Sequence, residues 1–125
     1  MRVCIPTAGW RGLDEYVSEH FGRAPTFTIV DLETGKVEVI PNTGKHGGGG
    51  GRTPAQTLVG LGIDALICSG IGPRAISFLE SLGIKVYYGA SGTVRDVIEN
   101  FKAGRLQEIS AGRPPCPEGR GSPEF

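Results

Sequence analysis

The chain has no excess of charge of either sign and no long apolar run, and each lack excludes a class of protein. Its 13 Lys and Arg residues balance 13 Asp and Glu residues. It therefore lacks the basic surplus with which proteins bind nucleic acid regardless of sequence. No apolar run approaches the roughly 18 residues that a membrane-spanning helix needs. We expect neither nucleic acid nor a membrane as a partner.

Cysteine is too sparse for a disulfide framework or a zinc site. Cys4, Cys68 and Cys116 are odd in number and far apart, which argues against disulfides and for a reducing compartment, the cytoplasm. The opening segment, MRVCIPT, has the character of a strand and lacks the apolar core of a signal peptide. Without a CxxC or CxxH spacing, a self-contained structural zinc site is not expected.

Catalytic motifs are also missing. The chain has no G-x-S-x-G elbow and no H-E-x-x-H, and Gly44-Lys45 is followed by His46 instead of the Ser or Thr of a phosphate-binding P-loop. The first strand, RVCIP, offers Cys4 and no acid, so a two-metal nuclease on such a sheet is not expected. No residue pair resembles a nucleophile with its base. We expect a protein that is not an enzyme.

What the chain does have is an alternation of strand and helix patterns. β-branched or apolar runs predict strands at residues 2–6, 26–31, 36–40, 63–69 and 84–88, the second and third joined by a turn at residues 33–35. Residues 9–25, between the first two strands, have mixed character and predict a functional loop with one helical turn. Capping patterns predict three helices: one from Thr53-Pro54 to Gly62, one from Gly72-Pro73 to Gly83, and one from Thr93, with Asp96 completing a cap, to Gly104.

This order predicts a three-layer α/β domain over residues 1–110. Strands that alternate with helices require crossover connections and a parallel core, to which the hairpin adds antiparallel strands. We expect a mixed sheet of about five strands. The last residues, AGRPPCPEGRGSPEF (111–125), are rich in Pro and Gly and predict a disordered tail, and GSPEF resembles a cloning-site remnant.

The segment NTGKHGGGGGRTP (42–54) contains a run of glycines between His46 and a predicted helix start. Free N–H groups and the helix dipole at such a start favour anions, and Arg52 adds a positive charge beside it. The simpler interpretation is a flexible connector. We interpret the segment as a mobile flap that carries His46 toward a site.

GIGPRA (70–75) matches the G-x-G-x-x-A dinucleotide fingerprint between a strand and a helix. The acidic residue that the fingerprint requires about 20 positions later is missing. Gly70 and Gly72 are equally well explained by a tight turn, so dinucleotide binding is a weak interpretation.

Three side chains are candidate metal ligands. His20 and His46, the only histidines, lie beside glycine in the two longest irregular segments, and neutral imidazole suits iron, zinc, copper and nickel. Cys68 ends an apolar strand at the sheet edge where open α/β sheets bind ligands. A buried, apolar role for Cys68 is the favoured alternative.

The chain resembles the dinitrogenase iron–molybdenum cofactor biosynthesis family in four segments, SEHFGRAPTFTIVD, NTGKHGGGGG, GIDALICSGIGPRAISFLESLGIKVY and TVRDVIENFKAGRL. That family includes NifX-type cofactor carriers and the C-terminal domain of NifB-type proteins. The resemblance covers residues 1 to 109, and HFGRAP followed by GIGPRA is its most specific part.

The resemblance implies a ribonuclease-H-like α/β fold without nuclease chemistry. It also implies that the chain binds or carries an iron–sulfur or iron–molybdenum cluster, or a precursor, with cluster-assembly proteins as partners. His20 becomes the first ligand candidate and His46 the second, while Arg23, Arg52 and Arg74 would neutralise an anionic cluster. The remaining residues of the implied cofactor-binding set are Asn42, Gly70 and Gly72.

Two other functions stay open from the sequence. One is a binding module for a small anion or nucleotide that uses the predicted helix starts at Thr53, Gly72 and Thr93. The other is a regulatory interaction module that binds no metal.

Overall fold

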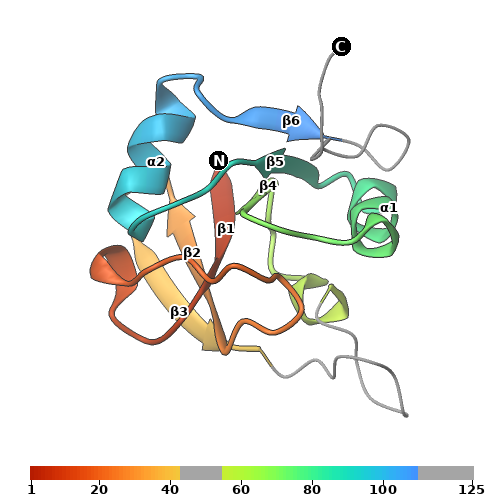
Figure 1. Ribbon diagram of the computed structural model, residues 1–125, viewed down its shortest axis with the longest axis horizontal. Coiled ribbons are helices and arrows are strands. Elements are labelled where there is room, and N and C mark those ends of the chain that lie inside the picture. Colours follow the sequence, from red (N-terminus) through yellow and green to blue (C-terminus); the bar gives the residue numbers. More distant parts are fainter. Residues whose placement is uncertain (43–54, 110–125) are drawn as a thin grey trace.

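The computed structural model describes residues 1–42 and 55–109, which build one mixed sheet with a helix on each face (Figure 1). The order of the six strands is β3-β2-β1-β4-β5-β6. An antiparallel half comprises β1 (Arg2–Thr7), β2 (Thr26–Asp31) and β3 (Val37–Pro41). The other half comprises β4 (Ala65–Cys68), β5 (Lys85–Tyr88) and β6 (Gln107–Ile109). Strand β4 pairs parallel with β1, β5 pairs parallel with β4, and β6 pairs antiparallel with β5.

The two helices, α1 (Pro73–Ser81) and α2 (Val94–Lys102), cover opposite faces of the sheet. Successive residues of a strand point to opposite faces. Cys4 and Leu66 therefore pack with Ile76 and Leu79 of α1. Their neighbours in the strands form a second core with α2, made of Val3, Ile5, Ala65, Ile67, Val94, Val97 and Ile98. The expected parallel core, antiparallel hairpin and three layers are confirmed, and the ribonuclease-H-like assignment stays a prediction.

The predicted sheet was one strand too small. The missing strand, β6, exposes Gln107 and Glu108 and buries only Ile109, which is 5% exposed. With one inward side chain in three residues, this strand carries no alternating pattern. It forms because its backbone pairs with β5, where Ile109 lies opposite Val86.

The predicted helix boundaries hold for α1 and α2. Pro73 opens α1 after Gly72, and Thr93 and Asp96 form a capping box at the start of α2. The helix predicted from Thr53 begins outside the described residues, and its described part is a short 3-10 turn, η2 (Gln56–Leu58). The long loop after β1 contains one 3-10 turn as expected, η1 (Gly12–Asp14). No helix in residues 1–42 and 55–109 has the length and apolar character to cross a membrane.

The loops that follow the three parallel strands meet at one edge of the sheet. The segment 8–25 crosses this edge, where Val17 N–H donates to Gly92 O (2.9 Å) and Ser18 N–H to Pro6 O (2.9 Å). Farther along, Phe21 N–H donates to Gly70 O (3.0 Å). The carboxyl edge of the parallel strands is where open α/β sheets place their ligands. Here it carries both sequence motifs, HFGRAP and GIGPRA.

Candidate functional site

His20 is an exposed side chain on a backbone that is held from both sides. Ser18 Oγ donates to His20 O (3.2 Å) and accepts from His20 N (3.4 Å). The next side chain, Phe21, is only 4% exposed and stacks on Phe27 with ring centroids 5.4 Å apart. The imidazole is therefore open to a ligand while its backbone is anchored in the core.

Gly70 lets the two motif loops approach each other closely. A Cβ atom at this position would lie 2.9 Å from Glu19 O, a backbone atom that cannot move aside alone. A hydrogen bond from Phe21 N–H to Gly70 O lies beside this contact. The two together place the loop that carries His20 (residues 19–25, the histidine loop) directly beside the turn that leads into α1. The glycine of this motif serves a close approach of two backbones and needs no dinucleotide to explain it.

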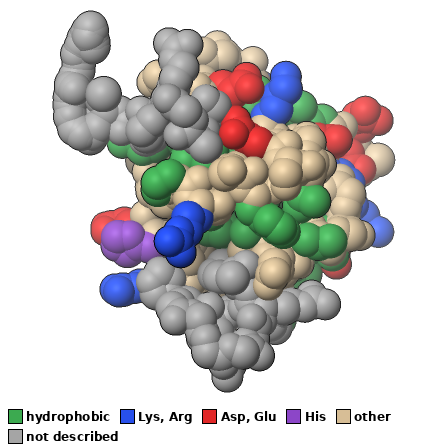
Figure 2. All heavy atoms as spheres, turned by 90° about the vertical axis from the view of Figure 1, so that its right-hand side faces the viewer, with side chains coloured by type: hydrophobic (Ala, Val, Ile, Leu, Met, Phe, Trp, Pro, Cys, Tyr) green, Lys and Arg blue, Asp and Glu red, His purple; other side chains and the backbone are tan. Residues whose placement is uncertain are grey.

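The start of α1 lies next to this contact. Gly72 is its N-cap and supplies no side-chain hydrogen bond, and Pro73 occupies the first turn. The free N–H groups of such a turn and the helix dipole favour a negatively charged ligand. Arg74 is exposed in the same turn, and Arg23 is exposed on the histidine loop. On the face shown in Figure 2, a histidine lies beside Lys or Arg side chains and an acidic side chain.

Asn42 reaches the same loop from the end of β3. Its backbone N–H donates to Pro25 O (3.0 Å) and its side-chain Nδ2 donates to Ala24 O (2.8 Å). The structure thus ties Asn42 and Gly70 to the loop that carries His20 and Arg23, through the neighbouring backbone of that loop, and Gly72 and Arg74 follow in the adjoining turn. His46 and Arg52 lie outside the described residues.

Cys68 lies apart from this surface. It is fully buried on the α1 side of the sheet, and its Sγ donates to Tyr87 O (3.6 Å). Burial raises the pKa of the Cys68 thiol to about 12, which disfavours the thiolate that metals bind. This geometry corresponds to the buried apolar role and not to an accessible ligand. Nowhere in residues 1–42 and 55–109 do three His, Cys, Asp or Glu side chains gather as a metal site would require.

The start of α2 is already occupied by the protein's own groups. Asp96 N–H donates to Thr93 Oγ1 (3.3 Å), and Thr93 N–H donates to Asp96 Oδ2 (3.1 Å). A carboxylate at this position repels an incoming anion. Of the three helix starts considered for anion binding, Thr53 is outside the described residues, and α1 offers the better described position.

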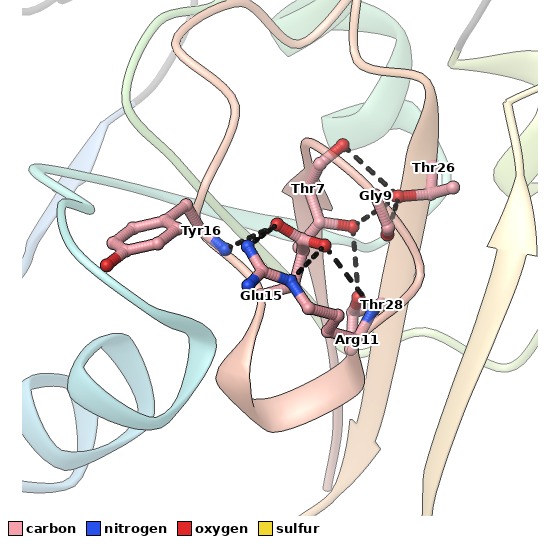
Figure 3. A network of polar contacts seen from close by, with 7 residues as sticks. All are labelled: Thr7, Gly9, Arg11, Glu15, Tyr16, Thr26 and Thr28. Carbon is pink, nitrogen blue, oxygen red and sulfur yellow. Dashed lines mark hydrogen bonds and ion pairs between the residues drawn. The ribbon is translucent and has the colours of Figure 1, made fainter.

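The carboxylate of Glu15, which was not among the predicted site residues, braces the first part of segment 8–25 (Figure 3). Glu15 is 5% exposed, and its carboxylate accepts from Arg11 Nε (3.2 Å), Arg11 Nη2 (3.2 Å) and Tyr16 N (2.9 Å). The Arg11 guanidinium and the Tyr16 N–H hold the pKa of the Glu15 carboxyl below its usual value. The spacing of Arg11 and Glu15, four residues apart, was the available signal. This brace fixes the loop while Trp10 and Tyr16 remain 62% and 56% exposed.

Three buried threonines tie the start of the same loop to β2 (Figure 3). Thr7 Oγ1 lies 2.6 Å from Thr26 Oγ1 and 3.0 Å from Thr28 Oγ1. Thr26 Oγ1 directs its single proton to backbone carbonyls, with Gly9 O at 2.5 Å and Thr7 O at 3.2 Å. Thr7 must then donate to Thr26, and Thr28 to Thr7. The hydroxyls form a one-way chain that ends on the loop carbonyl of Gly9.

Comparison with known proteins finds relatives that match most of the length of the chain. A family model described as "Dinitrogenase iron-molybdenum cofactor" matches residues 1–104. An uncharacterized protein of Methanocaldococcus jannaschii is 35% identical over 113 residues, which is 87% of this chain and 92% of that protein.

Two solved structures agree closely with this fold. A Thermotoga protein solved by NMR and named as a candidate NifB protein is 43% identical, with a TM-score of 0.75 over 86% of this chain and 91% of its own. The apo form of the orange protein from Desulfovibrio gigas is 32% identical, with a TM-score of 0.75 over 86% of this chain and 92% of its own. The chain therefore covers almost the full length of these relatives.

Proposed function

Because the chain belongs to the dinitrogenase iron–molybdenum cofactor family, we propose that it binds or carries an iron–sulfur or iron–molybdenum type cluster, or a precursor, without catalysing a reaction. The family match confirms the resemblance seen in the HFGRAP and GIGPRA segments. Membership relates the chain to the iron–molybdenum cofactor. Binding of a cluster as cargo, and its release to cluster-assembly proteins, are the parts that we propose.

The observation that carries this proposal is the setting of His20. An exposed imidazole stands on an anchored loop, and that loop touches the turn into α1 through Gly70. Neutral imidazole is a ligand for iron. The uncapped start of α1 and the exposed Arg23 and Arg74 add positive potential on the same side, which suits an anionic cluster.

The side chains available as ligands suit a cluster that is carried and released better than one that stays bound. Iron–sulfur clusters that stay in a protein are commonly held by four cysteine thiolates. In the part of the chain that the structure describes, the cysteines are Cys4 and Cys68, both buried. One accessible histidine with arginines around it would hold a cluster loosely enough to pass it on. His46, which lies outside the described residues, is the second ligand that we propose.

The test is an anaerobic titration of the purified protein with a cluster donor, followed by charge-transfer absorbance. We expect His20→Ala to weaken binding at least about tenfold, since even losing a group that only supports a ligand costs that much. Arg23→Ala and Arg74→Ala should weaken binding in a salt-dependent way. Arg105→Ala is the matched control, because Arg105 is exposed and pairs with Asn100 after α2. Equal binding by wild type and His20→Ala would refute the ligand assignment.

A second candidate function, binding of a small anion without metal, is favoured by the uncapped start of α1. It predicts that phosphate-bearing ligands raise the melting temperature in metal-free buffer, because a ligand that binds only the folded state stabilises it. The absence of any shift across a phosphate and nucleotide panel would eliminate this candidate.

A further inference from the structure

Asn42 contacts the histidine loop in a way that gives it a different role from the one implied by the family motif. We propose that Asn42 is a positioning residue: its side-chain amide holds the loop that presents His20 and Arg23 instead of touching the cargo. The inference rests on the proposed function only in taking His20 as the ligand.

Asn42 makes two hydrogen bonds to the loop, one from its backbone and one from its side chain. Asn42 follows β3 directly, one residue beyond the last pair of the β2–β3 ladder, Thr26 with Pro41. Its backbone N–H continues the ladder by donating to Pro25 O at 3.0 Å. Its Nδ2 then reaches Ala24 O at 2.8 Å. One residue therefore holds two successive carbonyl groups of the loop, the second with a side-chain donor.

The Asn42 contact holds one end of the loop that presents His20 and Arg23. At the other end, Phe21 is fixed by its packing on Phe27 and by its hydrogen bond to Gly70 O. Only Gly22 and Arg23 lie between Phe21 and the clamped Ala24, and His20 flanks the first anchor. Two anchors so close together fix both the direction of the chain and the place of its exposed side chains. Removing the Asn42 side-chain donor leaves this end of the loop with the backbone bond to Pro25 O and the packing of Ala24 in the core.

The position of Asn42 opposite Ala24 O requires a hydrogen-bond donor. A carbonyl oxygen needs a donor, and an amide NH₂ supplies one, whereas a carboxylate of the same shape accepts only. Asn42→Asp would therefore set an acceptor against Ala24 O. If residue 42 instead contacted a metal, Asn42→Asp should bind at least as well as wild type, since a carboxylate is a stronger metal ligand than an amide. The two roles predict opposite results for one substitution.

The first arm of the experiment uses the protein without cargo. Amide hydrogen exchange is measured for Phe21 and for residue 42 in wild type, Asn42→Ala and Asn42→Asp. We expect exchange about tenfold faster in both variants, because losing one hydrogen bond makes local opening easier by about that factor. Asn100→Ala is the matched control: Asn100 is also half-buried with a hydrogen-bonded side chain, but it lies at the end of α2. Rates within about twofold of wild type in the Asn42 variants would overturn the proposal.

The second arm titrates the same variants with the cluster donor. Positioning predicts weaker binding in both variants, with Asn42→Asp at least as weak as Asn42→Ala. If Asn42→Asp binds as wild type does while Asn42→Ala does not, Asn42 is a contact residue and the proposal is wrong. If His20→Ala binds normally, the ligand assignment fails, but the exchange arm still decides whether Asn42 holds the loop.

A variant on the other side of the loop covers the case in which the Asn42 variants do not fold. Gly70→Ala places a Cβ 2.9 Å from Glu19 O and so displaces the loop without altering Asn42. Positioning of His20 by its loop predicts that Gly70→Ala speeds exchange at residue 42 and weakens cluster binding together. Normal exchange at residue 42 and normal binding in a folded Gly70→Ala protein would contradict it.

Discussion

Replacing Thr26 with valine should destabilise the protein more than the same change at Thr28, although the two positions are closely matched. Both are fully buried on one face of β2, two residues apart, and valine keeps the shape of each side chain. They differ in their place in the hydroxyl chain, because only Thr26 donates to backbone carbonyls, Gly9 O and Thr7 O. The comparison therefore tests the direction of the hydrogen bonds.

The expected magnitudes follow from which groups lose a partner. Thr26→Val removes the donor to Gly9 O and the acceptor for the Thr7 hydroxyl. Leaving such groups unsatisfied costs about 2 kcal/mol. Thr28→Val removes only the first donor of the chain, and Thr7 keeps its bond to Thr26, so the cost stays below about 1 kcal/mol.

The assay is urea unfolding followed by circular dichroism, with thermal unfolding as a second measurement. For a domain of this size, about 2 kcal/mol lowers the melting temperature by roughly 10 °C. Equal losses at the two positions, or a larger loss in Thr28→Val, would refute the direction assigned to the chain. A Thr26→Val protein as stable as wild type would show that Gly9 O does not depend on the threonine.

Two further predictions concern Glu15 and the cysteines. The pKa of Glu15 is lowered in the folded protein, so the stability that its ionised carboxylate contributes is present above the ordinary value of 4.5 and is lost as the pH falls below it. The difference in urea midpoint between wild type and Glu15→Gln should therefore shrink from about pH 5 to about pH 3, and parallel curves would contradict this. In a Cys116→Ser protein, Cys4 and Cys68 should resist a thiol reagent at neutral pH until the chain unfolds, because both are fully buried. Rapid reaction of Cys68 in the native protein would restore it as a candidate ligand.

Features set by neighbouring residues could be predicted from the sequence. The capping box of Thr93 and Asp96 involves residues three apart, and the Gly72-Pro73 start of α1 involves two adjacent residues. The alternation of strands and helices was enough to predict the parallel core. These features hold because local propensity and the tertiary structure favour the same conformation.

Features set by distant residues could not be predicted. Glu15 is an acid in an irregular segment; its four-residue spacing from Arg11 indicates an ion pair but not burial, and its backbone is tied to the distant start of α2, where Val94 N–H donates to Glu15 O (2.9 Å). Asn42 was assigned to the cofactor-binding set, but its contact with Ala24 spans 18 residues and leaves no local pattern. His20, the proposed ligand, was singled out through its motif. The groups that hold its loop in place became visible only in three dimensions.

Strand β6 limits how far the C-terminus of the chain can be truncated before a sheet edge is exposed. The family match ends at residue 104, whereas β6 begins at Gln107. A protein trimmed to the family boundary would lose β6 and leave the outer backbone groups of β5 unpaired. An exposed strand edge of this kind is a template for pairing with another molecule. The short strand thus works as a cover against edge-to-edge association, and a trimmed protein should self-associate increasingly as its concentration rises.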